Sequence, residues 1–226
     1  MGTLNCRHFL HFLLKCVLIF SCICGLSVGS ELSFVTCGSV IKLLNVKHNV
    51  RLHSHDVRYG SGSGQQSVTG VSAMEDSNSY WSIRGTSDAS CARGTPVKCG
   101  QTIRLTHVNT GRNLHSHYFT SPLSSNQEVS AFGEEGEGDH LDEWTVQCGG
   151  SVWKREESVR FLHKATDALL SVTGEQYGRP IHGQMEVHAM SSTSQHSLWK
   201  VMEGIFMKPS ESPTGSRDYS HIHTEF

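Results

Sequence analysis

Two pairs of histidines have types and spacing that could do chemistry. Both have the pattern His-x-His: His53 with His55, and His115 with His117. Because residues i and i+2 of a β-strand face the same side, each pair could chelate a metal ion. However, no Cys or carboxylate recurs at matching offsets, and the third equivalent stretch reads Ser171-Val172-Thr173. We therefore expect these histidines to hydrogen-bond turns, and we predict no metal and no cofactor.

A glycine-rich segment, Tyr59-Gly60-Ser61-Gly62-Ser63-Gly64, follows the first pair. It lacks the Lys-Ser/Thr that a phosphate-binding P-loop requires, so a hairpin loop is the better interpretation. The polar residues beside this loop could form a concavity for a peptide or a sugar: His53, His55, Asp56 and Arg58. In that site Tyr59 would supply the aromatic platform.

An acidic run from Glu134 to Glu143 holds six carboxylates. It lacks the alternating Asp/Asn spacing of a preformed calcium loop, so we expect a solvated loop that offers a weak docking patch to a basic partner. No GxSxG motif marks a serine nucleophile among the many serines and histidines. We predict that the chain is not an enzyme and has no catalytic residues.

One pattern occurs three times along the chain, and it must position these residues. It opens at Val40–Leu44, Thr102–Thr106 and Ser158–Leu162, and it closes with a tryptophan: Trp81, Trp144 and Trp199. Each copy holds four short apolar stretches in which apolar and polar residues alternate, which is typical of half-buried strands. The pattern predicts three repeats of four strands, within about residues 35–90, 97–150 and 151–205.

Such a repeat cannot bury its apolar face alone, whereas three repeats closing around a pseudo-threefold axis can. The sequence therefore predicts an all-β fold, a β-trefoil over residues 31–209, with a β-sandwich as the alternative. We expect the three tryptophans to be equivalent and to pack against the barrel.

Four of the cysteines lie after residue 30, which suggests two disulfides in an oxidising compartment. The first and last strands of a trefoil lobe pair with each other, so a cysteine before one lies near a cysteine after the other. This geometry favours Cys37 with Cys91 and Cys99 with Cys148. The pairing of Cys91 with Cys99, and of Cys37 with Cys148, remains an alternative.

The first 30 residues have the composition of a cleaved signal peptide. Arg7 is followed by an apolar stretch in which the uninterrupted part, Cys16 to Leu26, is shorter than the ~20 residues that span a bilayer. Small residues up to Ser30 offer a cleavage site. An N-terminal membrane anchor is the alternative. No later segment is apolar enough to span a membrane, and the Ser/Pro/Gly-rich residues 210–226 are expected to form a flexible tail.

The charge of the chain limits its partners. With 19 basic and 21 acidic residues among 226, the formal net charge is −2, which argues against a nucleic-acid-binding surface. The content of 22 glycines and 5 prolines indicates many tight turns, as in an all-β chain.

The repeats resemble MIR repeats, which occur in protein O-mannosyltransferases and in inositol trisphosphate and ryanodine receptors. Longer motifs, from about Val35 to Pro209, resemble the stromal cell-derived factor 2 family: Tyr59 to Gly70, Asp76 to Trp81, Thr106 to His117, and Glu203 to Pro209. The resemblance implies three MIR repeats in a protein of the endoplasmic reticulum lumen. It also implies a non-catalytic partner of a lumenal J-domain co-chaperone that works with BiP on misfolded clients and in the unfolded-protein response.

The end of the chain departs from that family. Animal members usually finish in an HDEL-like retrieval signal, whereas this chain finishes in His223-Thr224-Glu225-Phe226. A receptor reads such signals as addresses, so the final Phe is expected to weaken retrieval and to favour secretion. A lectin-like module that binds mannose-containing glycans is the alternative function.

Overall fold

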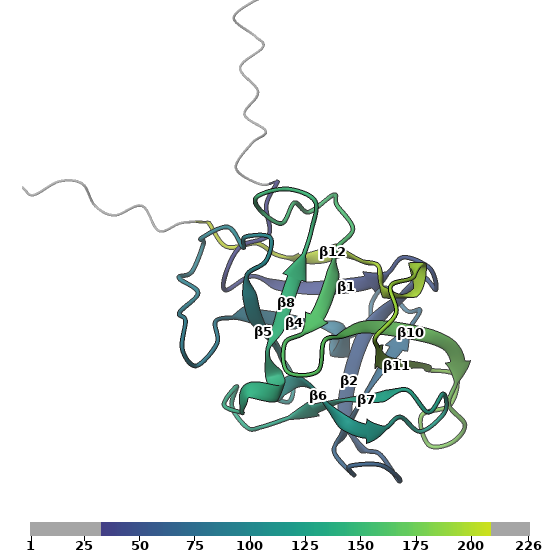
Figure 1. Ribbon diagram of the computed structural model, residues 1–226. Helices are drawn as coiled ribbons and strands as arrows, with labels where there is room; N and C mark the ends of the chain where they lie inside the picture. Colours follow the sequence, from purple (N-terminus) through teal and green to yellow (C-terminus); the bar gives the residue numbers. More distant parts are fainter. Residues whose placement is uncertain (1–32, 209–226) are drawn as a thin grey trace, which may run out of the picture. The chain divides into compact units, whose positions relative to one another are not determined.

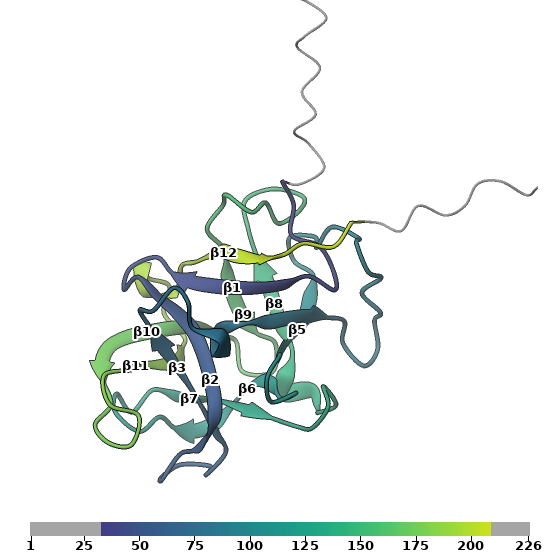
Figure 2. The ribbon, with the colours of Figure 1, turned by 180° about the vertical axis from the view of Figure 1, so that it is seen from behind.

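The computed structural model describes residues 33–208, and it holds strands and single 3-10 turns (Figures 1 and 2). The first four strands are β1 (Val40–Asn45), β2 (Val50–Arg58), β3 (Gln66–Val71) and β4 (Trp81–Arg84). The next four are β5 (Thr102–His107), β6 (Asn113–Thr120), β7 (Gln127–Phe132) and β8 (Trp144–Gln147). The last four are β9 (Arg160–His163), β10 (Ala168–Gln176), β11 (Met185–Met190) and β12 (Trp199–Ile205). The predicted signal peptide and the retrieval-like tail lie outside the described residues.

The strands pair antiparallel in a pattern that repeats three times. Six strands follow one another in a ring, in the order β1, β4, β5, β8, β9 and β12, and β12 pairs with β1. The step from β9 to β12 is a single bridge between Val159, just before β9, and Trp199. The others form the hairpins β2–β3, β6–β7 and β10–β11, and β3, β7 and β11 pair with one another. Each hairpin has an irregularity at the same place, after Ser54, Ser116 and Val172. This shared register lets residues of the three repeats be matched one to one.

The three closing tryptophans begin the last strand of each repeat and are fully buried. Each indole Nε1 donates to the carbonyl of a leucine in the second strand of its own repeat, over 2.8–2.9 Å: Leu52, Leu114 and Leu170. A buried indole needs such an acceptor, because an unpaired polar group in the core is costly. The tryptophans therefore tie the ring to the hairpins in every repeat.

A second set of contacts joins each repeat to the next. His107 Nε2 bonds the Asn78 carbonyl, His163 Nε2 bonds the Leu141 carbonyl, and Asn45 donates to the His196 carbonyl. The acceptors belong to the 3-10 turns η1 (Ser77–Ser79), η2 (His140–Asp142) and η3 (Gln195–Ser197). Because the third repeat bonds back to the second and the first bonds back to the third, this set closes around the molecule.

The strands of the ring are more deeply buried than simple alternation predicts. Ile41 and Leu43 face the core as expected, but Lys42 between them is only 2% exposed. Its ammonium group donates to the Met74 carbonyl and lies 4.5 Å from the centre of the Tyr80 ring. The polar positions are covered because the loop before each closing tryptophan folds over them.

The cysteines form two disulfides, Cys37–Cys91 and Cys99–Cys148, with Cα–Cα distances of 5.4 and 5.3 Å. This is the connectivity favoured from the repeats. Each bridge links the entry of one repeat to the segment after its last strand. No helix within residues 33–208 is long and apolar enough to cross a membrane.

Candidate functional site

The first histidine pair is part of an internal hydrogen-bond chain. Since a carboxylate accepts, His53 Nδ1 donates to Asp76 over 2.8 Å, and its Nε2 lies 2.7 Å from His55 Nδ1. His53 is 4% exposed, and Asp76 precedes the turn η1. Burial, and then the charge of His53, lowers the pKa of His55. His53 thus links β2 to the residue that precedes η1, and His55 bonds His53.

The second pair has different partners. His115 Nδ1 donates to Asp142 over 2.9 Å, and His117 Nε2 lies 3.0 Å from Glu128 Oε1. Both carboxylates are fully buried. The two pairs occupy equivalent places in β2 and β6, yet the second is anchored by carboxylates from two separate segments.

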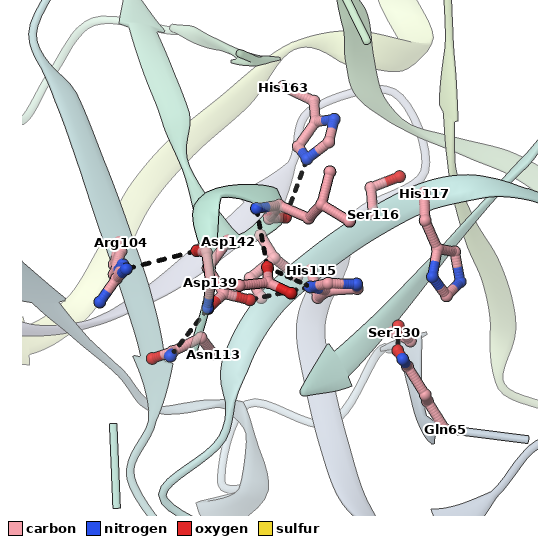
Figure 3. A network of polar contacts seen from close by, with 12 residues as sticks. Gln65, Arg104, Asn113, His115, Ser116, His117, Ser130, Asp139, Asp142 and His163 are labelled. Carbon is pink, nitrogen blue, oxygen red and sulfur yellow. Dashed lines mark hydrogen bonds and ion pairs between the residues drawn. The ribbon is translucent and has the colours of Figure 1, made fainter. Parts of the chain in front are cut away.

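One cluster near the second pair has donor atoms at metal-binding distances. His115, Asp139 and Asp142 each offer one atom within 4.8 Å of the others (Figure 3). Asp139 accepts from the Leu141 amide, and Asp142 accepts from the Asp139 amide, each over 2.8 Å. Asn113 also donates to Asp142. These oxygens complete a capping box around η2, so we assign the cluster to stabilising that turn.

The acidic run is only partly the solvated loop that we expected. Glu134, Glu135 and Glu137 are exposed, but Asp142 and Glu143 are buried. Asp142 is held by the turn and by His115, and Glu143 pairs with Lys164 over 2.7 Å. Net charge alone could not reveal this division, because it depends on which carboxylates find donors in the fold: Asp142 finds them within its own repeat, and Glu143 finds Lys164 on the next.

Tyr59 is not available as an aromatic platform for a sugar. The side chain is 7% exposed, and its hydroxyl is bonded to the carbonyls of Val68 and Val129, each over 2.9 Å. The ring packs in a small apolar cluster with Tyr177 and Ile181. Burial raises the pKa of the Tyr59 hydroxyl well above its usual value. Tyr59 therefore closes the end of the hairpins, and the expected polar concavity lacks its predicted ring.

Arg58 and Asp56, which were expected to join His53 and His55, instead point into solvent. Arg58 lines a groove of about 370 Å³ together with Gln65, Arg112, Phe132 and Glu134. We call this the charged groove. It lies where the first repeat meets the second, and its two guanidinium groups make no hydrogen bond with other described residues.

A larger groove of about 480 Å³ lies where the second repeat meets the third. We call it the neutral groove, because every residue that lines it is uncharged. Its rim carries Tyr118 and Phe119, which are 82% and 51% exposed. Its remaining walls come from the start of β7, from the turn before β10 and from the end of β11.

The two grooves are the same place in successive repeats. Arg58 pairs with Gln66 in the first hairpin, and Thr120 pairs with Gln127 at the matching position of the second. The same registers match the other residues of the two grooves. Each residue of the charged groove corresponds to a smaller uncharged residue of the neutral groove: Arg58 to Thr120, Arg112 to Ala168, Phe132 to Met190, and Glu134 to Ser192. One backbone frame thus carries two different surfaces.

Comparisons with known proteins agree with the repeated all-β frame. A family model described as the MIR domain matches residues 42–148. Human stromal cell-derived factor 2 is 75% identical over 183 residues, which cover 81% of this chain and 87% of that protein. This chain belongs to the stromal cell-derived factor 2 family. The human stromal cell-derived factor 2-like protein 1 is 67% identical and covers 84% of this chain and 85% of that protein.

Solved structures of similar proteins extend this family assignment to the fold. The crystal structure of an SDF2-like protein from Arabidopsis thaliana has a TM-score of 0.76 and 42% identity, over 79% of this chain and 99% of that one. The protein O-mannosyltransferase Pmt1-Pmt2 complex of S. cerevisiae has a TM-score of 0.69 and 27% identity. That match covers 80% of this chain and 26% of the other, so this chain is similar to one part of that protein.

Two buried carboxylates and two linking histidines were not predicted from the sequence. Glu128 holds the Ser63 amide and His117, and Glu186 accepts from the amides of Leu123 and Ser124. His107 and His163 each bond a threonine three residues later and pack on a closing tryptophan. The His-x-x-Thr spacing recurs at the 56-residue offset of these repeats, so comparing the repeats could have found them.

Proposed function

We propose that this chain is a non-enzymatic component of a complex in the endoplasmic reticulum lumen. Its partners in the proposal are a J-domain co-chaperone and BiP, and its task is to keep misfolded client proteins from aggregating. The observation that carries the proposal is the family membership, through 75% identity to human stromal cell-derived factor 2 over most of both chains. The proposal includes no nucleic-acid partner.

Features of the fold support this proposal. Two disulfides suit an oxidising compartment, where bridges form and persist. The histidines and carboxylates that could have served in catalysis are bonded to one another and to turns. We further propose that the three groups of strands are three MIR repeats in a β-trefoil, and that a signal peptide is removed near Ser30. The likeness to a designed three-fold symmetric protein, ThreeFoil, at a TM-score of 0.50 and 14% identity, supports the proposed trefoil.

Affinity capture of the tagged full chain from secretory cells tests this function. Half of the lysate is deglycosylated before capture, and the co-purifying proteins are identified by mass spectrometry. A J-domain protein and BiP in both halves would support the proposal. Glycoproteins that disappear after deglycosylation, without any chaperone, would replace the proposal with the lectin-like alternative.

A second measurement tests the client role. A thermally aggregating client is followed by light scattering with the purified J-domain partner, with and without this chain. We expect aggregation to fall further when both are present than with the partner alone. Bovine serum albumin at equal concentration controls for non-specific protection. Equal protection by albumin would contradict the proposed role.

A further inference from the structure

Two aromatic rings stand exposed at the rim of the neutral groove. Tyr118 and Phe119 lie near the end of β6 and are 82% and 51% exposed. The Phe119 ring is held in place, because it packs on the His117 ring with centroids 4.7 Å apart. His117 is itself held by the buried Glu128 over 3.0 Å. The rim is therefore a supported platform.

The floor of the groove presents an acceptor of fixed orientation. Gln127 Nε2 donates to Ser116 Oγ over 2.7 Å and to Thr166 Oγ1 over 2.8 Å. These two bonds fix the amide plane, and Gln127 Oε1 accepts no hydrogen bond from other residues of the described range. Gln66, its equivalent in the charged groove, makes the same two kinds of bond, but it is fully buried. Gln127 is half-buried and lines its groove, and the positions of Arg58 and Arg112 are taken there by the smaller Thr120 and Ala168.

Hydroxyl groups complete the lining. The side chains of Ser125, Ser191 and Ser192 line the groove and make no hydrogen bond with other residues between 33 and 208. With the amide of Gln127, they offer donors and acceptors without charge. Binding sites for small ligands combine apolar or aromatic surface with a few placed polar groups of this kind.

The chemistry of the lining defines what it would bind. The absence of charged side chains from the lining gives no advantage to phosphate, carboxylate or ammonium ligands. A peptide strand would need an unpaired sheet edge, but Thr120 and Gln127 are paired with each other. A neutral pyranose has an apolar face that packs on a ring and hydroxyls that bond to amide and serine groups. We propose that the neutral groove is a binding site for an uncharged saccharide.

This inference does not depend on the proposed chaperone function. NMR titration of the isotope-labelled full chain tests it, with methyl glycosides of mannose, glucose, galactose and N-acetylglucosamine, and with lactose and sialyllactose. We expect at least one neutral sugar to shift the ring signals of Tyr118 and Phe119 at millimolar concentration. Tyr118→Ala should weaken that binding by about tenfold, since loss of one ring contact is worth about 1.4 kcal/mol.

Matched variants come from the other repeats. Gln127→Met places there the residue that stands at Met185 in the third repeat, so the fold accommodates it, and it should abolish binding. Asp56→Ala changes the exposed position equivalent to Tyr118 and should leave binding unchanged. Capture of BiP by Tyr118→Ala should persist, which separates this site from the proposed function.

Three outcomes would overturn the proposal. The first is no ring shift with any of the neutral sugars up to about 50 mM, far above the range of weak specific sites. The second is tighter binding of sialyllactose than of lactose. The third is a shift caused instead by a neutral peptide such as Gly-Ser-Phe-Ser-Gly, which would identify a peptide groove.

Discussion

The charged and neutral grooves are built on one frame and differ in what covers it. Below both, a glutamine bonds a serine of its own repeat and a threonine of the next. Gln66 at the charged groove is fully buried, whereas Gln127 lines the neutral groove, where Thr120 and Ala168 stand at the positions of Arg58 and Arg112. A repeated fold can therefore keep its internal contacts and change its surface chemistry through two or three side chains.

The largest expected effect comes from breaking the frame that both grooves share. Trp144 is fully buried, donates to the Leu114 carbonyl and packs on His163 with centroids 4.8 Å apart. Trp144→Ala should lower the free energy of unfolding by about 3–5 kcal/mol, the usual cost of removing a core tryptophan. Urea denaturation followed by far-UV circular dichroism measures it.

The surface variant Tyr118→Ala is the control for that measurement. Its ring is 82% exposed, so the free energy of unfolding should stay within about 0.5 kcal/mol of the wild type. If both variants lost similar stability, the division between a shared frame and a variable rim would be wrong.

The third repeat differs from the first two in its internal contacts at His188. At this position in β11 the earlier repeats have Thr69 and Ser130, which bond glutamine side chains, whereas both ring nitrogens of His188 lack a partner among the described residues. Burial lowers the pKa of His188 to about 4. As pH falls, the unfolded chain protonates this histidine at a higher pH than the folded chain does. The stability is therefore fully present above pH 6.5 and falls between pH 6.5 and 4.

His188→Ser copies the second repeat and removes this titration. The wild type should lose up to about 3 kcal/mol more than the variant between pH 6.5 and 4, as the pKa difference requires. Urea unfolding at a series of pH values measures the slope. His107, whose pKa burial also lowers to about 4, remains in both proteins and cancels in the difference. Parallel slopes for the two proteins would contradict the assignment.

Glu128 connects the two grooves. It accepts from the Ser63 amide, beside the charged groove, and bonds His117, which supports the rim of the neutral groove. Burial would raise the pKa of Glu128, but hydrogen bonds from His117 and Ser63 outweigh it and lower the pKa below 4.5. Its stabilising effect is present above pH 4.5 and is lost as pH falls through the lowered pKa.

Glu128→Gln should therefore cost about 1–3 kcal/mol at pH 7, the range for a buried hydrogen-bonded charge. Below pH 4.5 the variant and the wild type should converge. Glu134→Gln, at an exposed acidic position, is the matched control and should change stability little at any pH. Thermal unfolding scans from pH 7 to 3 distinguish these cases.

Much of the frame follows from the repeated pattern. The four short apolar stretches in each copy predicted four strands in each repeat, and the pairing of Cys37 with Cys91 followed from the positions of the first and last strands. These features are periodic or local, so one sequence displays them. His107 and His163 occupy the same position in successive repeats. Their hydrogen bonds to the preceding repeat could therefore also have been suspected from the sequence.

The surface could not be predicted in the same way. Tyr59 follows a polar strand end and precedes glycines, as an exposed ring would, yet it closes an apolar cluster with Tyr177 from the third repeat. Arg58 was expected beside His53, but it faces a groove formed with Arg112. Each outcome depends on which repeat lies next to a hairpin, and that information appears only when the hairpins are matched in three dimensions.

The smallest expected effect on stability, and the sharpest test of the comparison, is to convert one groove into the other. The variant Asp56→Tyr/Arg58→Thr/Arg112→Ala gives the charged groove three residues of the neutral one and keeps Phe132 and Glu134. Asp56 and Arg58 are exposed and Arg112 is half-buried, so the free energy of unfolding should change by about 1 kcal/mol or less.

If covering side chains alone separate the two surfaces, this variant should bind the neutral sugar at two places, and NMR should report a second set of shifts near Gln66. Asp56→Tyr alone supplies a ring but keeps Arg58 and Arg112, so it should add no second site. A second site in the single variant would show that the ring suffices and that the glutamine acceptor is not needed. The pair of variants thus separates the contribution of the platform from that of the floor, which no substitution in the neutral groove can do alone.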